Sequence, residues 1–229
     1  LSDNSLKLKK FLNKYYQLNN ENLINGNFSL ELNECLDCSH IYHSKVLDEN
    51  SIVKLYTDIV SNREKILKNA TDKTSSNIKF AEKIASIMNK KIDVLDFGSG
   101  MVYYPKDHTS CKFYTYEISS KKKSDSEITQ NELINKKFDL IIANQVMEHS
   151  THPKEISLIF EKIIKENGFL KIELPSSFLL KFKIFLYRLL GPKEILLEDF
   201  FPLEHVNSFS KISLLKLFEN FREYKNNKK

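Results

Sequence analysis

The segment Ile92–Gly100 constrains the fold of this chain more than any other part of the sequence. Its first six residues form a nearly continuous apolar run, which is typical of a strand that is buried on both faces of a parallel sheet. Gly98 and Gly100 follow directly, and glycine lets the backbone turn tightly and approach a ligand closely. The segment therefore predicts an inner strand of an α/β sheet that ends in a glycine turn.

Strands and helices are predicted to alternate around this segment. Three further short apolar runs predict strands, at 112–117, 138–143 and 169–174. Apolar residues at helical spacing predict helices at about 78–88, 156–164, 178–190 and 210–220. Asn167-Gly168 is the predicted end of the second of these helices. The alternation predicts a Rossmann-like, mostly parallel α/β sheet with flanking helices.

The first 75 residues have a different pattern. It predicts a helix at 5–18, a loop with a short strand at 19–34 and a helix at 52–60. The polar run 70–77 predicts a linker. We therefore expect a small helical N-terminal appendage at 1–75 and a main domain at 76–229.

Composition excludes several classes of protein. With 41% hydrophobic residues among 229, the chain can bury a real core, which excludes a disordered chain, and three cysteines exclude a disulfide scaffold. The net charge of +5 comes without a long basic block, which disfavours a nucleic-acid binder. No apolar run reaches the roughly 18 residues of a membrane-spanning helix, and no signal peptide opens the chain. The expectation is a soluble cytoplasmic protein.

Glu117 strengthens the interpretation of the glycine turn as a binding site. It closes the strand predicted after the turn, about 20 residues beyond Asp96, where an acid can bind both hydroxyls of a ribose. A dinucleotide fingerprint would need a third glycine where Tyr103 stands, which disfavours NAD. The pattern predicts a nucleoside-type cofactor at this edge of the sheet.

Four segments together resemble the successive signatures of class I S-adenosylmethionine-dependent methyltransferases. They are Val-Leu-Asp-Phe-Gly-Ser-Gly at 94–100, Tyr-Glu-Ile-Ser at 116–119, Phe-Asp-Leu-Ile-Ile-Ala-Asn-Gln-Val-Met-Glu-His at 138–149 and Asn-Gly-Phe-Leu-Lys-Ile-Glu-Leu-Pro at 167–175. Their order and spacing match the family across about 78–220. The resemblance implies an enzyme that transfers a methyl group from S-adenosyl-L-methionine to an oxygen, nitrogen or carbon nucleophile.

The resemblance also implies which residues bind the cofactor. They are Asp96, Gly98, Ser99, Gly100, Glu117, Asn144 and Gln145. Asp96 and the glycines would line the methionine end, and Glu117 would bind the ribose. Residues 201–210 are similar to a segment of a bacterial subset of these enzymes, which modify sugars or other small molecules. A small-molecule acceptor, such as a sugar or a glycan or metabolite precursor, is therefore expected.

Three departures from the family pattern keep a second interpretation open. Val102 stands where the third glycine of the loop is usual, and the segments on both sides of Glu117 are short. The chain ends at Lys229, so the domain is expected to lack the family's last two strands. These features favour a catalytically degenerate binding or scaffold protein, whereas Asp96, Glu117 and Glu148-His149 favour an enzyme.

Two histidines are the candidate catalytic residues. His149 follows the strand at 138–143, and His205 lies in the segment that should close over the same pocket. We predict that His149 is the general base for the acceptor and that His205 orients it, because imidazole titrates near neutral pH. The alternatives are a capping or core role for His149 and a backbone-bonded loop histidine for His205.

The cysteine pair and one basic helix leave further alternatives open. Cys35 and Cys38 form a Cys-x-x-Cys pair, which is half of a zinc knuckle. The pair resembles the second half of a zinc module that precedes some of these methyltransferases, so it is a remnant site, a structural zinc site or a pair of ordinary cysteines. The helix at 178–190 is a lid over the substrate pocket, inserted at about 176–205, or a membrane-surface helix.

Overall fold

The computed structural model describes residues 2–3, 30–47, 52, 55, 64–100, 102, 104–105, 108–117, 126–190 and 203–224. The helix predicted at 5–18 lies outside these residues, as do most of the segments 19–34 and 52–60. Within the described ranges, no helix has the length and apolar character needed to cross a bilayer.

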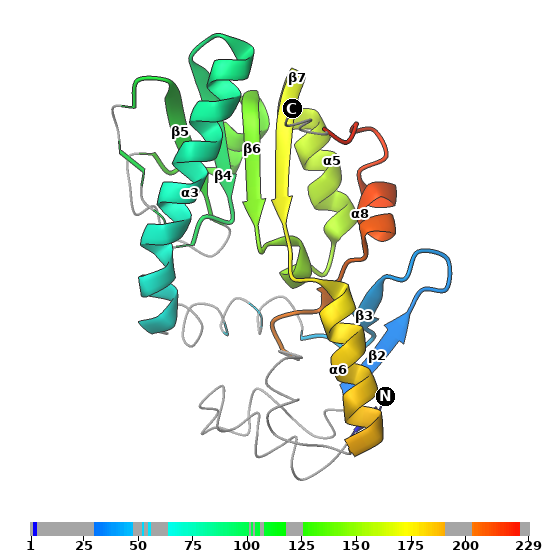
Figure 1. Ribbon diagram of the computed structural model, residues 1–229. Coiled ribbons are helices and arrows are strands. Elements are labelled where there is room, and N and C mark those ends of the chain that lie inside the picture. Colours follow the sequence, from blue (N-terminus) through cyan, green and yellow to red (C-terminus); the bar gives the residue numbers. More distant parts are fainter. Residues whose placement is uncertain are drawn as a thin grey trace, which may run out of the picture.

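Four parallel strands form the central sheet of the described chain (Figure 1). They are β4 (Ile92–Phe97), β5 (Cys111–Tyr116), β6 (Phe138–Asn144) and β7 (Ile164–Glu173). Their spatial order is β5-β4-β6-β7, with parallel pairing throughout. The Rossmann-like fold class and the predicted strands are thereby confirmed.

One predicted boundary is wrong. Asn167-Gly168 was expected to end a helix, but the helix ends at Ile163 and both residues lie inside β7. A side chain on Gly168 would approach the Asp139 backbone oxygen to 3.1 Å. It would also lie 2.8 Å from the Ile164 side chain and 2.9 Å from the Lys165 backbone oxygen, both in β7. The glycine therefore permits the local path of β7, beside a register irregularity in its pairing with β6.

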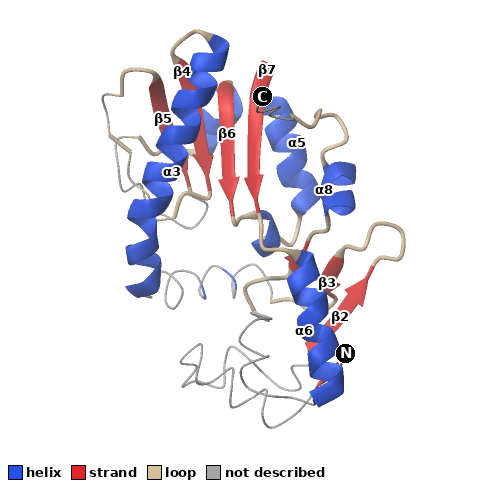
Figure 2. Cartoon of the chain, in the orientation of Figure 1, coloured by secondary structure: helices blue, strands red, loops and turns tan. Residues whose placement is uncertain are grey.

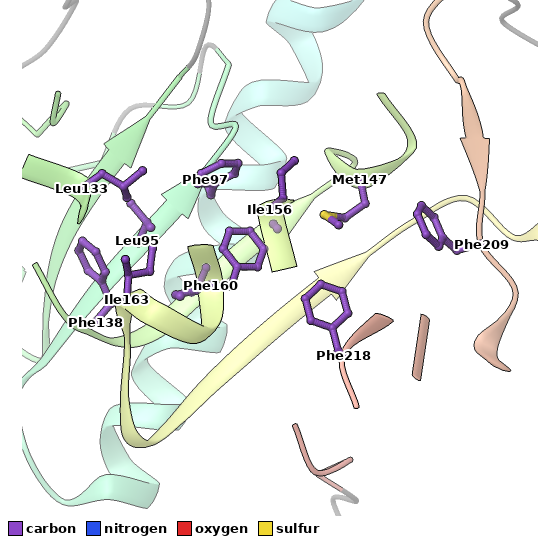
Figure 3. Packing of buried hydrophobic residues seen from close by; sticks show 12 residues of the cluster. Leu95, Phe97, Leu133, Phe138, Met147, Ile156, Phe160, Ile163, Phe209 and Phe218 are labelled. Carbon is purple, nitrogen blue, oxygen red and sulfur yellow. The ribbon is translucent and has the colours of Figure 1, made fainter. Parts of the chain in front are cut away.

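Helices cover both faces of the sheet (Figure 2). They are α3 (Glu64–Met88), α4 (Gln130–Asn135), α5 (Pro153–Ile163) and α8 (Lys211–Leu217). On one face of the sheet, Ile84 of α3 packs in the same cluster as Val94 of β4. The next residue of β4, Leu95, points to the other face and packs in the cluster that contains Phe160 of α5. Figure 3 shows this second cluster. In it, the Phe97 and Phe160 rings contact each other edge to face, with 5.0 Å between the ring centroids.

The linker predicted at 70–77 is also wrong, because these residues lie within the continuous helix α3. Its later turns are anchored by the buried Ala81, Ile84 and Ala85. The polar side chains that suggested a linker are mostly exposed on the preceding turns, while Asn77 is buried at 2% exposure. The helix thereby buries a polar side chain that forms hydrogen bonds with Tyr104 and Asn144.

The described residues 2–3 and 30–47 of the N-terminal appendage form strands and turns and no helix, whereas its described residues 52, 55 and 64–75 are helical. The prediction of a helical appendage is therefore wrong for the first of these two parts. The strands are β1 (Ser2–Asp3), β2 (Leu30–Glu34) and β3 (Ile41–His43), and they pair with β8 (Asn207–Ser208) in the antiparallel order β1-β2-β3-β8. Alternation along β3 buries Ile41 and His43 and leaves Tyr42 exposed. Because β8 comes from the other predicted domain, the appendage and the C-terminal region share one sheet.

The helix α6 (Ser177–Leu190) follows β7 and lies beside β2 and β3 (Figure 1). Its Lys181 Nζ lies 2.5 Å from Glu34 Oε1 of β2. The strands of the central sheet point their carboxyl ends towards α6 and the β2–β3 hairpin (Figure 2). This end of the sheet is where ligands bind in open α/β folds.

Candidate active site

The glycine turn lies at the carboxyl end of β4. Gly98 has a φ of 70° and Gly100 a φ of 61°, a region that side-chain-bearing residues rarely adopt. A Cβ atom on Gly98 would lie 2.5 Å from the Val146 side chain, so no larger residue fits there. Among the described residues, no atom lies within 4 Å of a Cβ atom placed on Gly100, so none of them fills the space beside its backbone.

Glu117 lies directly against this turn. The backbone N–H of Gly100 donates a hydrogen bond to Glu117 Oε2 at 3.0 Å. The N–H groups of Gly98 and Ser99 both point to the Tyr116 carbonyl oxygen, at 2.8 and 3.4 Å. The ends of β4 and β5 therefore bring Gly98, Ser99, Gly100 and Glu117 together.

Asp96 is the buried acid of this edge, at 3% exposure. The Tyr104 hydroxyl donates to its Oδ2 at 2.5 Å, and Asn77 Nδ2 donates to the Tyr104 oxygen at 2.9 Å. Burial raises the pKa of Asp96 to about 6, although the hydrogen bond from Tyr104 acts in the opposite direction. At pH 7 the carboxylate is thus charged and poorly hydrated, which suits contact with a cationic group.

Asn144 joins this polar network from the end of β6. Its Nδ2 donates to Asn77 Oδ1 at 2.9 Å, and its own Oδ1 is buried without a hydrogen-bond partner among the described residues. An unsatisfied buried oxygen in the network that contains Asp96 is a position that a donor from a ligand can fill. The neighbouring Gln145 is exposed and has a φ of 55°, with its backbone N–H bonded to Glu173 at 2.8 Å.

Sequence reasoning missed two members of this network, Asn77 and Tyr104. Asn77 lies in the polar run that resembled a linker, so its inward orientation had no local signal. Tyr104 follows the glycine turn and stacks on Phe113 at 4.3 Å between ring centroids. Val102, at the position of the usual third glycine, is 8% exposed and packs in the same apolar cluster as Tyr104.

A second group of side chains follows β6, where Glu148 and His149 end the short 3-10 helix η2 (Met147–His149). Glu148 is 2% exposed, and neither of its carboxyl oxygens has a hydrogen-bond partner in the described part of the chain. His149 Nε2 lies 4.0 Å from Glu148 Oε1, and the His149 and His205 ring centroids are 4.7 Å apart. The structure therefore brings the two predicted catalytic histidines together and adds Glu148, which sequence reasoning did not assign.

Burial dominates the protonation of this group. It raises the pKa of Glu148 to about 7 and lowers the pKa of His149 to about 4 and that of His205 to about 3. Both imidazoles are therefore neutral at pH 7. His149 Nδ1 lies 2.8 Å from the Glu204 carbonyl oxygen, which can only accept, so Nδ1 carries the proton and Nε2 the lone pair.

A pocket of about 250 Å³ adjoins this group. Its lining includes the ionisable side chains of Glu148, His205, His43 and Lys183. The β2–β3 hairpin, α6 and the start of the segment after β7 supply apolar walls. None of the predicted cofactor-binding residues lines it. The pocket thus lies beside the glycine turn rather than in it, on the side where β6 and β7 end.

Cys35 and Cys38 lie apart from both groups, in the turn between β2 and β3. Cys35 N donates to His40 O and Ser39 N donates to Cys35 O, both at 2.8 Å. Hydrogen bonds from the backbone N–H groups of Cys38 and Asp37 lower the pKa of the Cys35 thiol. Within the described residues, the pair belongs to no group of three or more metal-ligating side chains, so these residues supply two zinc ligands and not four.

The third cysteine, Cys111, begins β5 and is buried in the cluster beneath α3, as expected of a core residue.

The sequence pattern of the methyltransferase domain family matches residues 66–221. The match runs from α3 through α8 and includes the glycine turn, Glu117 and both histidines. No curated protein matches the chain. The parallel sheet, with its glycine turn and acid at adjacent strand ends, agrees with the family match, and the chain therefore belongs to the methyltransferase domain family and has the fold of the class I methyltransferases.

Proposed function

We propose that this methyltransferase uses S-adenosyl-L-methionine to methylate a small-molecule acceptor, such as a sugar or a glycan or metabolite precursor. The observation that carries the proposal is the convergence of Asp96, the Gly98–Gly100 turn and Glu117 at the ends of β4 and β5. An acid on each of two adjacent strand ends, with a glycine turn between them, suits an amino-acid group and a ribose.

The residues present fit this cofactor. The charged Asp96 can face the methionine ammonium group, and Glu117 can accept from the ribose hydroxyls. The space beside Gly100 leaves room for the cofactor. The unsatisfied Oδ1 of Asn144 provides a hydrogen-bond acceptor. When bound, the cofactor supplies an electrophilic methyl group on a sulfonium, and the task of the chain is to align it with the acceptor.

We assign the acceptor to the 250 Å³ pocket beside η2. His205 lines the pocket and would orient the acceptor, while His149 would receive the proton of the reacting group through Nε2. A neutral imidazole with its lone pair on Nε2 has the protonation state that a proton acceptor needs. The apolar walls from α6 and the hairpin would exclude water from the same space.

The degenerate-protein alternative rests on the glycine loop. Val102 packs in the core where a third glycine is usual, and the Gly100 N–H is bonded to Glu117. If the loop cannot adjust, the fold would remain without cofactor binding. Titration with S-adenosylmethionine separates the two functions.

The test of the cofactor proposal is Glu117→Ala. Hydrogen bonds to a charged acceptor contribute about 1.5–3 kcal/mol, so the variant should bind S-adenosylmethionine at least about tenfold more weakly by calorimetry. Glu166→Ala, an exposed acid in β7, is the matched control and should bind like the parent. Equal affinity in parent and Glu117→Ala would refute the ribose assignment, and no binding by the parent would favour the degenerate alternative.

Structural zinc at Cys35 and Cys38 remains a separate proposal. Its support is the lowered thiol pKa of Cys35 and the tight backbone turn around the pair. Metal analysis of protein prepared without chelator should find close to one equivalent of zinc more in the parent than in Cys35→Ser.

A further inference from the structure

Among the described residues, Glu148 is the one whose side chain has two buried polar atoms without a hydrogen-bond partner. These atoms are its two carboxyl oxygens, and the residue is 2% exposed. Burying a carboxyl group without a hydrogen-bond partner is unfavourable unless a ligand or an ion compensates it. Glu148 also lines the pocket, so its side chain borders the space that a ligand would occupy.

The imidazoles of His149 and His205 lie close to this carboxyl group. One ligand atom from each of Glu148, His149 and His205 can be chosen so that all three lie within 4.8 Å of one another, and no other such group occurs among the described residues. Ligand atoms about 2.1 Å from one ion stand about 3–4 Å apart, so small side-chain rotations close the site. The 4.0 Å between His149 Nε2 and Glu148 Oε1 already lies at that limit.

The orientation of His149 is also that of a metal ligand. Its Nδ1–H donates to the Glu204 carbonyl oxygen, which directs Nε2 towards Glu148. Metal-ligating histidines commonly donate their other ring N–H to a carbonyl or a carboxylate, which fixes the tautomer and the ring. Glu204 immediately precedes His205, so one backbone segment orients the first imidazole and supplies the second.

We propose that Glu148, His149 and His205 bind a divalent transition-metal ion at the edge of the pocket. Two neutral imidazoles and one carboxylate on one side of an ion suit iron, cobalt, zinc or manganese, and leave further positions open. The positions on the pocket side would take oxygen atoms of the acceptor, which selects acceptors with a hydroxyl group.

This role rests on the proposed function and refines it. A hydroxyl oxygen bound to the ion loses its proton more easily, and the proton would pass to water. The oxygen would then form a bond to the methyl carbon as the carbon–sulfur bond breaks, and the electron pair of that bond would remain on sulfur, giving a neutral thioether. In the metal-bound protein, His149 and His205 would act on the acceptor proton through the ion rather than directly.

The test is a titration of the full chain with Co²⁺ after removal of metal by a chelator. The protein carries Cys35→Ser and Cys38→Ser, so that thiolates cannot bind the ion. We expect one equivalent of Co²⁺ with ligand-field absorption bands of nitrogen and oxygen ligation. Glu148→Gln and His205→Ala should each weaken binding at least about tenfold.

Two exposed residues nearby provide matched controls. His152→Ala and Glu155→Gln change the same residue types at the start of α5 and should leave Co²⁺ binding unchanged. The thermal midpoint of the parent should also rise with added Co²⁺, and this rise should disappear in His205→Ala even if Glu148→Gln fails to fold. Absence of saturable Co²⁺ binding by the parent would overturn the site, as would Co²⁺ binding by Glu148→Gln and His205→Ala that is as tight as in the parent.

Titration of the same samples with S-adenosylmethionine separates this proposal from the proposed function. Metal binding without cofactor binding would contradict the proposed function alone. Cofactor binding without metal binding would contradict the metal site alone.

Discussion

At the scale of single residues, Asp96 shows how burial sets the chemistry of the cofactor edge. Its carboxyl group accepts from the Tyr104 hydroxyl, which Asn77 holds from α3. Desolvation outweighs this hydrogen bond and leaves the pKa at about 6, above the ordinary value of 3.8. The charge of Asp96 is therefore present at pH 7 and lost on mild acidification.

This pKa predicts a pH dependence of cofactor binding. Protonation below pH 6 removes the negative charge that would face the methionine ammonium, so affinity for S-adenosylmethionine should fall between pH 7 and pH 5, by up to about tenfold per pH unit below the pKa. Calorimetry at three pH values measures the slope. Asp96→Asn should bind more weakly at pH 7 and lose most of the slope, and an unchanged slope in that variant would assign the pH dependence to another group.

The histidine pair makes a second prediction at this scale. His149→Ala and His205→Ala should each lower turnover by about a hundredfold or more, because each removes a group that acts on the acceptor. Affinity for S-adenosylmethionine should stay within about twofold of the parent, since neither residue belongs to the glycine-turn group. Turnover would be followed with the acceptor identified by mass spectrometry of co-purified ligand, with His152→Ala as control. Near-normal turnover in both variants would contradict the catalytic roles of the two histidines and would mean that the chain acts only by aligning the methyl donor with the acceptor.

At the scale of elements, α6 has two different faces. Leu179, Leu180 and Lys183 line the pocket, although Leu179 is also 55% exposed. Phe178, Phe182 and Phe185 do not line the pocket and are 74%, 54% and 60% exposed. The pocket-lining face and the Lys181–Glu34 ion pair favour the lid interpretation of this helix. A membrane-surface helix also has exposed aromatic side chains, so the exposed phenylalanines fit the alternative interpretation of α6.

The lid interpretation predicts ligand-dependent protection of α6. Amide hydrogen exchange over Ser177–Leu190 should slow when S-adenosylmethionine and the acceptor bind, because a closed lid opens less often. Exchange in α5 provides the internal control and should change little. Strong binding to liposomes with no ligand-dependent protection would favour the membrane-surface alternative.

At the scale of the whole molecule, an ion network joins the strands at the end of the sheet opposite the site. Asp139 of β6 is 1% exposed and accepts from Lys90 at 2.6 Å, from Lys165 at 2.8 Å and from the Asp93 backbone at 2.9 Å. Burial alone would raise the pKa of Asp139, but the hydrogen bonds from Lys165 and Lys90 lower it below 3.8. The network therefore ties β4, β6 and β7 together where they begin.

Asp139→Asn should lower the free energy of unfolding by about 2 kcal/mol, since it removes the charge from hydrogen bonds to two partly exposed lysines. Because the folded-state pKa is lowered, this contribution is fully present above the unfolded pKa of 3.8 and is lost as pH falls through the lower folded value. Denaturant unfolding at pH 7 should show the loss, and the difference between parent and variant should shrink below about pH 4. Asp72→Asn, on the exposed side of α3, is the control and should unfold like the parent.

The sequence by itself determined the central sheet and the cofactor edge. Buried parallel strands have local apolar runs in the sequence, so the bounds of β4, β5 and β6 were predictable to within a residue or so. The glycines and Glu117 could be assigned to the cofactor edge because they lie at the ends of these strands. Only the tertiary structure decided the rest, because those features depend on contacts between distant segments. The pairing of β8 with β3 and the inward turn of Asn77 leave no local periodicity. The meeting of Glu148 with His205 depends on the path of the chain after β7, which brings back to the sheet edge a residue far along the sequence.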